Sequence, residues 1–544
     1  MFKIDLAFRK KSLEVNSICH TDNISVSGKI ELPYVVESDK NQSVILIGEA
    51  KSYEHDWVDI SIAANKLLRN EANETDFYGE FLSLRLLKNN VNIYTDAFGQ
   101  FPVYYAIDSE GGISLSSGPV CKSLIQAGQR IDIDFIFNYI NHGYYLQGRT
   151  AVSGLNILSP GFRYSLLLNG ILTKENVIND VFAKAQTSSP FCVLRQSLAR
   201  KVTLHDKIVL ELSGGVESSS IAAVLSKHKK EKDIRFLTYY DKYSLSSNEL
   251  QYAKNVSEHF NVVLDVIELS ARPPFTPFTD IIPFHTLPGS YSCIYNQQHY
   301  IANRYDKNSL FINGHGGDSI YLAPSPPALF MELLLNIGLN KAMKTLYGIS
   351  LQHHSSIIYE VQESLRNRYL SRINPNLWYY DAVKNLSKYK NPATIFWWQT
   401  LASTISEVIP VLNSSFSGKN IFYPFLSSPV IINALKTGFD KFVNKEFNRY
   451  SLRKSVYINS GYKGIWRTDK GDTTHNMLEG LSKNFHSVRD FILDGQIADK
   501  KLINLEHTEK ALKNLNLGLP DALPTIVRLY SAEACLRSIK EGGL

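Results

Sequence analysis

The 544-residue sequence has few cysteines and no long apolar run. Its five cysteines lie far apart, with no CxxC pair and no Cys/His cluster at zinc spacing, which argues against a disulfide framework or a zinc site. The most apolar run, "ALFMELLLNIGL" from Ala328, contains Glu332 and falls short of the roughly 20 residues that span a bilayer. The first residues, "MFKIDLAFRKKSLEV", mix charges among apolar side chains, so we expect no export signal. These absences predict a cytoplasmic protein with reduced cysteines and no membrane partner.

The sequence also lacks a strong charge imbalance. It has 58 basic and 52 acidic residues, for a net charge of +6, and 44% hydrophobic content typical of a globular protein. This small excess permits an anionic substrate but does not demand nucleic acid, and no nucleic-acid partner is expected. The length suggests more than one domain.

The pattern of apolar residues changes near residue 180. Before it, short alternating segments such as "SVILIGEA" and "FPVYYAI" are separated by turn residues, which indicates antiparallel sheet. From Asp206 onward, apolar strands alternate with helices, and after about Ala328 helical periodicity dominates. The predicted fold is therefore α/β: a domain over residues 1–180 with antiparallel sheet, and a domain over residues 181–544 with a doubly wound parallel sheet and added helices.

A glycine turn at a helix start is the first candidate site. In "VLELSGGVESSSIAAVL", from Val209, the turn Gly214-Gly215 lets backbone amides approach a ligand, and the following helix start suits an anion. Ser218 and Ser219 add hydroxyl donors, and Glu217 faces a divalent cation on the phosphates. The phosphate-loop pattern GxxxxGK[ST] is absent. The alternative is a turn whose serine merely caps the helix.

A second glycine turn follows about a hundred residues later, in "SLFINGHGGDSIYLAP". Here a strand opens into Gly314, Gly316 and Gly317 and then Asp318. Loops at the carboxyl ends of neighbouring parallel strands converge on one crevice, so Glu217 and Asp318 are predicted to hold Mg²⁺ between them. The alternative is a glycine turn capped by the aspartate.

The two segments together resemble a known family. The first is similar to the SGGxDS motif of ATP pyrophosphatases, with Glu217 in place of the family's aspartate. Both resemble the synthetase domain of the asparagine synthetase superfamily, and GHGGD looks like the microcin-type lasso-peptide cyclases. "YPFLSSPVIINAL" resembles the family's "PFLD" segment, with Ser427 replacing the acid, and "YKGIWRTDKGD" resembles the stretch that supplies a catalytic lysine, here Lys470.

The amino-terminal part resembles a class II glutamine amidotransferase domain of the Ntn-type α+β fold, on the segments "FYGEFLSLRLL" to "GGISLSSG" and "INHGYYLQGRT". That enzyme class uses a cysteine as its first mature residue, whereas this sequence begins Met1-Phe2 and its first cysteine is Cys19. Glutamine hydrolysis is therefore not expected, and the domain is structural or substrate-binding. Without an ammonia source, the amine must come from the substrate.

The resemblance implies an ATP-dependent carbon–nitrogen ligase that forms AMP and requires ATP and Mg²⁺. It would adenylate an Asp or Glu side chain of a leader-cleaved precursor peptide and join it to the peptide's terminal amine, which closes a macrolactam. The implied partners are the precursor peptide, a leader peptidase and a leader-binding protein. Two alternatives stay open: an adenylating synthetase for a small metabolite, and a non-catalytic peptide-binding homologue whose ATP site has decayed at Glu217.

The resemblance also implies roles for residues. Lys470 would stabilise charge on the acyl oxygen and phosphate, and Arg467 would contact phosphate. His315 would take the proton of the amine or shape its loop, and Glu407, weighed as its partner, is left unassigned because acids are common on helix surfaces. The implied catalytic residues are Lys470, His315 and Arg467. The implied ATP contacts are Leu212, Ser213, Gly214, Gly215, Glu217, Ser218, Ser219, Tyr239, Asn313 and Gly314. The implied metal ligands are Glu217 and Asp318.

Overall fold

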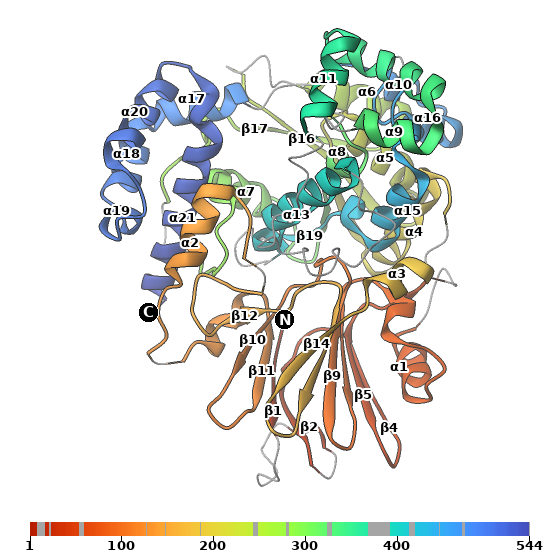
Figure 1. Cartoon of the computed structure of the whole chain (residues 1–544), viewed down its shortest axis with the longest axis vertical. Helices are drawn as coiled ribbons and strands as arrows, with labels where there is room; N and C mark the ends of the chain where they lie inside the picture. The colour runs from red at the N-terminus through yellow and green to blue at the C-terminus, as the bar shows by residue number, and fades with distance from the viewer. Residues whose placement is uncertain are drawn as a thin grey trace.

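The computed structural model of the chain describes most of its residues. The described residues are 1–7, 17–20, 23–53, 59–126, 128–146, 148–184, 187–242, 249–278, 282–323, 329–367, 392–412, 419–444, 446–469 and 474–542. Antiparallel strands form the lower part of the molecule in Figure 1, and a parallel sheet surrounded by helices forms the upper part. Among the described residues, no helix has both the length and the apolar character that a membrane crossing requires.

Two six-stranded antiparallel sheets make up the amino-terminal part, with strand orders β12-β10-β11-β1-β3-β2 and β14-β13-β9-β8-β5-β4. Ile4 of the first sheet and Ile93 of the second belong to one buried apolar cluster, so the sheets share a core. The strands are β1 (Phe2–Ala7), β2 (Ser17–His20), β3 (Ser25–Ile30), β4 (Tyr34–Ser38), β5 (Ser43–Gly48), β8 (Phe81–Leu86), β9 (Asn90–Thr95), β10 (Val103–Ile107), β11 (Ile113–Ser117), β12 (Asn156–Ile157), β13 (Phe162–Leu167) and β14 (Leu172–Asn176), with a separate pair β6 (Lys51–Ser52) and β7 (Phe77–Tyr78).

Strand β5 is buried on both of its faces. Successive side chains of a strand point to opposite faces, so Ile45 and Ile47 enter the shared core while Val44 and Leu46 point outward. Helix α1 (Ile60–Leu68) covers these outward residues and forms a second apolar cluster with them. The continuous apolar run of this strand therefore reflects helix cover on its outer face.

A five-stranded parallel sheet organises the carboxyl-terminal part, with the order β17-β16-β15-β18-β19. Its strands are β15 (Lys207–Glu211), β16 (Asp233–Tyr240), β17 (Leu264–Glu268), β18 (Leu310–Ile312) and β19 (Asn420–Phe422). The chain runs from β15 outward to β17 and then adds β18 on the other side of β15. Open parallel sheets bind ligands at such a switch point, beyond the carboxyl ends of the strands.

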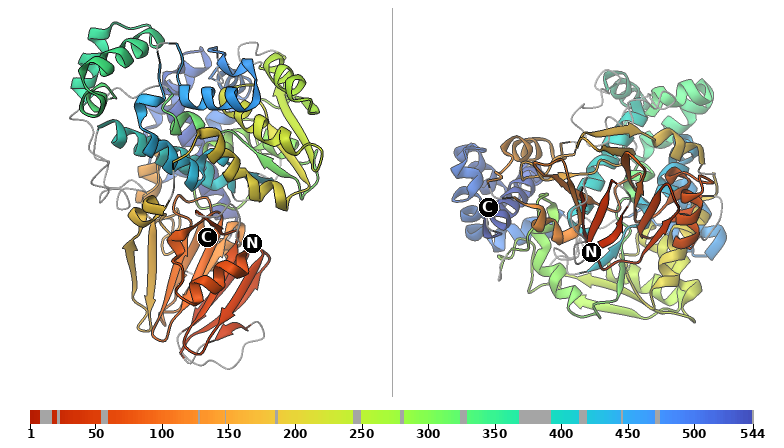
Figure 2. Two further views of the ribbon diagram at one scale, coloured as in Figure 1. Left: turned by 90° about the vertical axis from the view of Figure 1, so that its right-hand side faces the viewer. Right: turned by 90° about the horizontal axis from the view of Figure 1, so that it is seen from below.

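Helices pack around this sheet and continue to the end of the chain (Figures 1 and 2). They are α3 (Ile178–Lys184), α4 (Pro190–Leu204), α5 (Val216–Leu225), α6 (Leu250–Phe260), α7 (Tyr295–Ala302), α8 (Gly317–Ile320), α9 (Leu329–Ile337), α10 (Leu339–Gln352), α11 (Ile357–Asn367), α13 (Pro392–Leu412), α15 (Ser428–Thr437), α16 (Tyr450–Ser460), α17 (Thr474–Lys483), α18 (Phe485–Leu493), α19 (Gln496–Asp499), α20 (Leu505–Asn516) and α21 (Leu523–Glu541). Helix α2 (Ile133–His142), from the amino-terminal part, packs against α21.

The loop after β9 joins the two parts of the chain. Asp96 holds this loop by accepting hydrogen bonds from the backbone N–H groups of Phe98 and Gln100. Gln100 Nε2 donates to the carbonyl oxygen of Tyr423 at 2.8 Å, and the Phe98 ring stacks on Trp398 with centroids 6.5 Å apart. The amino-terminal part therefore supports the segment after β19, which borders the switch point.

The antiparallel and parallel sheets and the mixed α/β class are confirmed by the strand pairing. The structure adds β19 in the part predicted to be helical. The sequence did not indicate this strand, because three residues are too few to show a strand pattern. The structure also adds β1, whose charged residues alternate with the buried Phe2, Ile4 and Leu6. All five cysteines are free thiols. The domain boundary at residue 180 and the glutamine amidotransferase-like class of the first domain stay predictions.

Candidate functional site

A cavity of about 660 Å³ lies at the switch point, beyond the carboxyl ends of β15 and β18. Most of the residues assigned from the sequence border it: Leu212, Ser213, Gly215, Glu217, Ser218, Tyr239, Asn313, Gly314, His315, Asp318 and Arg467. Gly214 and Ser219 are not part of its wall; Gly214 packs toward α6, and Ser219 is buried inside α5. Lys470 lies outside the described residues, and the two residues before it, Thr468 and Asp469, border the cavity.

The first glycine turn places the start of α5 at the cavity. Its N-cap residue is Gly215, and no side chain forms a capping hydrogen bond to this helix end. Ser213 Oγ instead accepts a hydrogen bond from Gly215 N at 3.2 Å and lies 3.2 Å from Ser218 Oγ. A helix leaves its first N–H groups without acceptors inside the helix. The turn therefore presents a helix end suited to phosphate rather than a serine-capped helix.

Gly214 is required by both backbone conformation and space. Its φ of 75° lies in the left-handed region, and a Cβ would lie 2.6 Å from the carbonyl carbon of Tyr252 on α6. We expect Gly214→Ala to lower the free energy of unfolding by about 3 kcal/mol and to abolish nucleotide binding, because α6 must move. Gly518→Ala is the control, since Gly518 has a φ of 87° but no atom within 4 Å of its added Cβ. Thermal unfolding and ATP titration check both variants; equal behaviour would contradict the steric argument.

The second glycine turn brings Asp318 against the first. A Cβ on Gly317 would lie 2.4 Å from Glu217 Cγ, so the two loops are in direct contact. Asp318 lies in the first turn of α8, whose N-cap is Gly316, so the aspartate does not act as the cap. The nitrogen Nη1 of Arg449 contacts Glu217 Oε1 at 2.5 Å and Asp318 Oδ1 at 2.6 Å. The two predicted metal ligands thus converge on one positive charge.

This convergence shows that the two carboxylates fit a divalent cation. Mg²⁺ is usually held by one or two carboxylates together with phosphate oxygens and water. No group of three or more His, Cys, Asp or Glu side chains at metal-binding spacing occurs in the described part of the chain. Glu217 and Asp318 would therefore hold Mg²⁺ only together with the phosphates, and Arg449 would have to turn away from them.

Glu217 is buried between the loops. Burial raises its pKa from 4.5 to about 7, although Arg449 opposes this rise. Between these pH values the folded protein keeps a proton that the unfolded chain has lost, so the free energy of unfolding falls as pH rises from 4.5 to 7. In Glu217→Gln we expect the free energy of unfolding to fall by about 3 kcal/mol less than in wild type over this pH range. Metal-free denaturant titrations across this range, with Glu506→Gln on the surface of α20 as the control, measure the difference; parallel pH profiles for wild type and Glu217→Gln would contradict it.

Arg467 borders the cavity but its guanidinium is already engaged. It donates to the carbonyl oxygen of Gly214 at 3.2 Å and to Glu249 Oε1 at 3.0 Å, and it lies 3.5 Å from the ring centroid of Tyr252. Arg453, which is buried, donates to the carbonyl oxygen of Arg467 at 2.7 Å. Arg467 therefore holds the first glycine turn in place, and its predicted contact with phosphate stays a prediction.

His315 lies beside Glu407 of α13. The distance from His315 Nε2 to Glu407 Oε2 is 3.3 Å, which is close enough for an ion pair but lacks hydrogen-bond geometry. The backbone N–H of His315 donates to Asn313 Oδ1 at 2.7 Å, which fixes the loop. The loop is therefore shaped by Asn313, which leaves the His315 ring to face Glu407 and the cavity.

A buried polar chain supports the cavity floor. The side chains of Asn313 and Lys419 both donate to the carboxylate of Glu211, at the end of β15. Lys419 is fully buried and lies 4.6 Å from the ring centroid of Phe311. Because breaking such a buried pair is costly, these hydrogen-bonded side chains fix the ends of β15 and β18 relative to each other.

Several residues at the cavity were not assigned from the sequence: Glu211, Arg449 and Arg453 border it, and the fully buried Lys419 contacts Glu211. Arg449 and Arg453 occur in "NRYSLRKSV", a basic helix start that is typical of a solvated surface. One signal was available for Glu407, which is the only charged residue in the stretch "LASTISEVI". An acid in such a stretch is expected to have a buried partner or to face a cavity.

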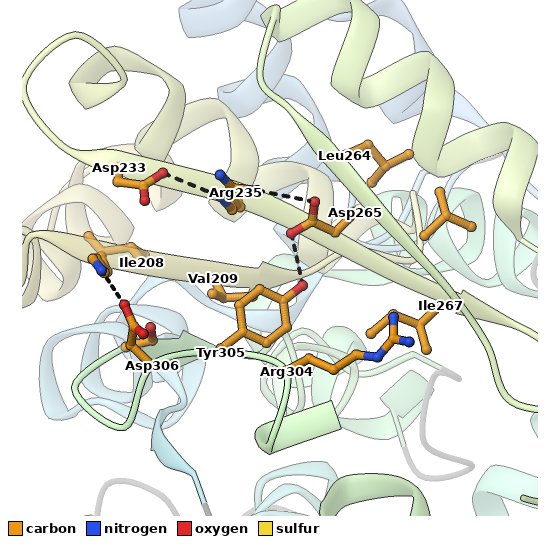
Figure 3. A pocket seen from close by; sticks show the side chains of 13 residues that line it. Ile208, Val209, Asp233, Arg235, Leu264, Asp265, Ile267, Arg304, Tyr305 and Asp306 are labelled. Atoms are coloured by element: carbon orange, nitrogen blue, oxygen red, sulfur yellow. Dashed lines mark hydrogen bonds and ion pairs between the residues drawn. The ribbon is translucent and has the colours of Figure 1, made fainter. Parts of the chain in front are cut away.

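A second cavity, of about 530 Å³, lies at the opposite, amino-terminal edge of the parallel sheet (Figure 3). Most of its charged side chains are paired: Lys207 contacts Asp306, Arg235 contacts Asp265, and the Tyr305 hydroxyl donates to Asp265. Paired charges at the edge away from the switch point give no indication of a ligand site.

Comparisons with known proteins identify the family of the chain. No curated protein matches the chain. The solved structures that match include two at 9% identity over 47% of this chain: the allosteric regulatory enzyme of purine biosynthesis (68% of that chain, TM-score 0.18) and glutamine phosphoribosylpyrophosphate amidotransferase from B. subtilis with ADP and GMP (69%, TM-score 0.19). TM-scores this low support no conclusion. The model of the asparagine synthase family matches residues 192–522, more than half of the chain. The chain therefore belongs to the asparagine synthase family, and this membership implies ATP-dependent amide-bond formation through an adenylated acid.

Proposed function

We propose that this chain closes a macrolactam in a peptide. ATP would adenylate an Asp or Glu side chain of a leader-cleaved precursor, and the terminal amine of the same peptide would then displace AMP. The family supports the adenylation and amide steps. The peptide substrate is supported by the GHGGD sequence around His315, which resembles lasso-peptide cyclases.

In the first step, an oxygen of the side-chain carboxylate attacks the α-phosphorus of ATP, and the bond from this phosphorus to the pyrophosphate oxygen breaks. The start of α5, behind the Gly214-Gly215 turn, would bind the departing pyrophosphate. Glu217 and Asp318 would hold Mg²⁺, which neutralises charge on the phosphates when bound. Arg449, released from the two carboxylates, would add a positive charge on the same side of the cavity.

In the second step, the amine nitrogen attacks the acyl carbon, and the bond from this carbon to the AMP oxygen breaks. The nitrogen would lose a proton to the pair formed by His315 and Glu407, whose side chains lie 3.3 Å apart. Lys470 would stabilise the charge on the acyl oxygen. Attack within one molecule gains from holding the amine and the adenylate together.

One observation carries the proposal: two glycine loops and α13 bring the uncapped start of α5, two convergent carboxylates and a His–Glu pair to one cavity. Convergence of Glu217 with Asp318 on Arg449 favours a working metal site over a decayed one, because the longer glutamate still reaches the common position. This supports an enzyme over a non-catalytic peptide-binding homologue.

Exchange of radiolabelled pyrophosphate into ATP tests the proposal and its substrate class. We expect exchange that depends on Mg²⁺ and on acid-containing peptides freed of their leader. Exchange with small amino acids but with no peptide would instead favour a small-metabolite synthetase. We further propose that a leader peptidase supplies the free terminal amine, with a leader-binding protein presenting the precursor; an uncleaved precursor should then give exchange without product.

A further inference from the structure

Helix α13 presents one polar strip to the switch-point cavity. Thr400, Ser403, Thr404 and Glu407 all border it. Residues spaced three or four apart share one face of a helix, so these four form a continuous strip. Most other positions of this stretch are buried and apolar, apart from Gln399 and the buried Ser406: Trp397, Trp398, Leu401, Ala402, Ile405, Val408 and Ile409. Packing alone does not require polar side chains on this helix, so the strip indicates what the cavity holds.

The two threonine hydroxyl groups of the strip donate their hydrogens within the helix and are left as acceptors. Thr400 Oγ1 donates its hydrogen to the carbonyl oxygen of Phe396 at 3.0 Å, and Thr404 Oγ1 donates to the carbonyl oxygen of Thr400 at 2.9 Å. Ser319 Oγ lies 2.7 Å from Thr404 Oγ1 and must therefore be the donor in that contact. A hydroxyl has one hydrogen, so each threonine has only lone pairs left to offer the cavity. The carboxylate oxygens of Glu407 are likewise acceptors.

The two sides of the cavity therefore differ in charge and in hydrogen-bonding character. On the side of the glycine loops, a helix start and Arg449 suit anions, and the carboxylates of Glu217 and Asp318 contact that arginine. On the α13 side, Glu407 has only the His315 ring within ion-pair distance among the described residues. A group that binds there must donate hydrogen bonds and gains from a positive charge.

We propose that Thr400, Ser403 and Glu407 bind the nucleophile, a primary amine that enters as its ammonium form. This inference rests on the proposed function, because it assigns the attacking amine a place opposite the phosphates in the same cavity. The ammonium group has three donors, which match the two hydroxyl oxygens and the carboxylate. His315, next to Glu407, then receives the proton that the nitrogen must lose before it attacks.

Binding of glycinamide, a small primary amine, tests this assignment without requiring turnover. Saturation-transfer NMR on the full chain gives its Kd for wild type, for the double variant Thr400→Val with Ser403→Ala, and for Glu407→Gln. We expect the Kd to rise by about tenfold or more in both variants, because each removes acceptors for a charged donor. The matched control is Thr203→Val, since Thr203 Oγ1 also donates to a carbonyl of its own helix, that of Ala199 at 3.0 Å, far from the cavity. N-acetylglycinamide, which lacks the ammonium group, should not compete.

An unchanged Kd in both variants, competition by N-acetylglycinamide, or no saturable binding to wild type would overturn the assignment. Pyrophosphate exchange in the same preparations reports on the proposed function separately. Exchange absent with every acid, together with glycinamide binding that depends on Thr400 and Glu407, would remove the macrolactam proposal and leave the amine site in place. Exchange present with unaffected glycinamide binding would remove only the amine site.

Discussion

Replacing Glu407 by glutamine is expected to slow amide formation by about 100- to 1,000-fold, because the amine loses both its ionic contact and its route for proton loss. Glutamine has the same size as glutamate and still accepts a hydrogen bond, so the substitution removes the charge and little else. Pyrophosphate exchange, which precedes amine attack, should suffer far less. Single-turnover formation of the amide, measured beside the exchange rate, separates the two steps.

The control for this substitution is Glu258→Gln, on the exposed surface of α6. It removes the same charge from the protein without altering the cavity. The account of the His315–Glu407 pair would be wrong if Glu407→Gln slowed exchange and amide formation equally, since the residue would then act before the amine attacks.

Replacing Arg449 by methionine is expected to lower the free energy of unfolding of the metal-free protein by about 3–5 kcal/mol. Arg449 is buried, and its removal leaves the carboxylates of Glu217 and Asp318 close together without a positive charge between them. Added Mg²⁺ should recover stability in the variant more than in wild type, because the ion no longer competes with a resident cation. Denaturant titrations with and without Mg²⁺ measure both effects.

Arg489→Met provides a matched control, because Arg489 also contacts two carboxylates, Asp490 at 2.9 Å and Glu509 at 3.3 Å, but on the surface. Exposed ion pairs contribute about 0–1 kcal/mol, so this variant should be close to wild type with or without Mg²⁺. Equal losses in the two arginine variants would mean that burial of Arg449 between the carboxylates has no special effect.

The two glycine loops could be predicted from the sequence because their signals are local. A buried strand, a glycine turn and a helix start follow one another within a few residues at Gly214 and again at Gly316. Their meeting at one cavity follows from topology, since β15 and β18 are neighbours in a parallel sheet. This reasoning placed Glu217 and Asp318 together without any side-chain information.

The partners of these residues could not be predicted in the same way. Arg449 reaches Glu217 across 232 positions of the chain, and Gln100 reaches Tyr423 across 323. No local pattern encodes such contacts, and an arginine at a helix start is usually solvated. The burial of the outward face of β5 could not be predicted either, because it depends on α1 packing over that face.

The most direct test of the central claim uses a leader-cleaved peptide whose acidic side chain carries the heavy oxygen isotope in its carboxyl group. With the protein, ATP and Mg²⁺, the account predicts a peptide product that is lighter by the labelled oxygen and two hydrogens, and one labelled oxygen in each AMP formed. Label appearing in inorganic phosphate with release of ADP, or ATP cleavage that leaves the peptide mass unchanged, would contradict adenylation followed by ring closure.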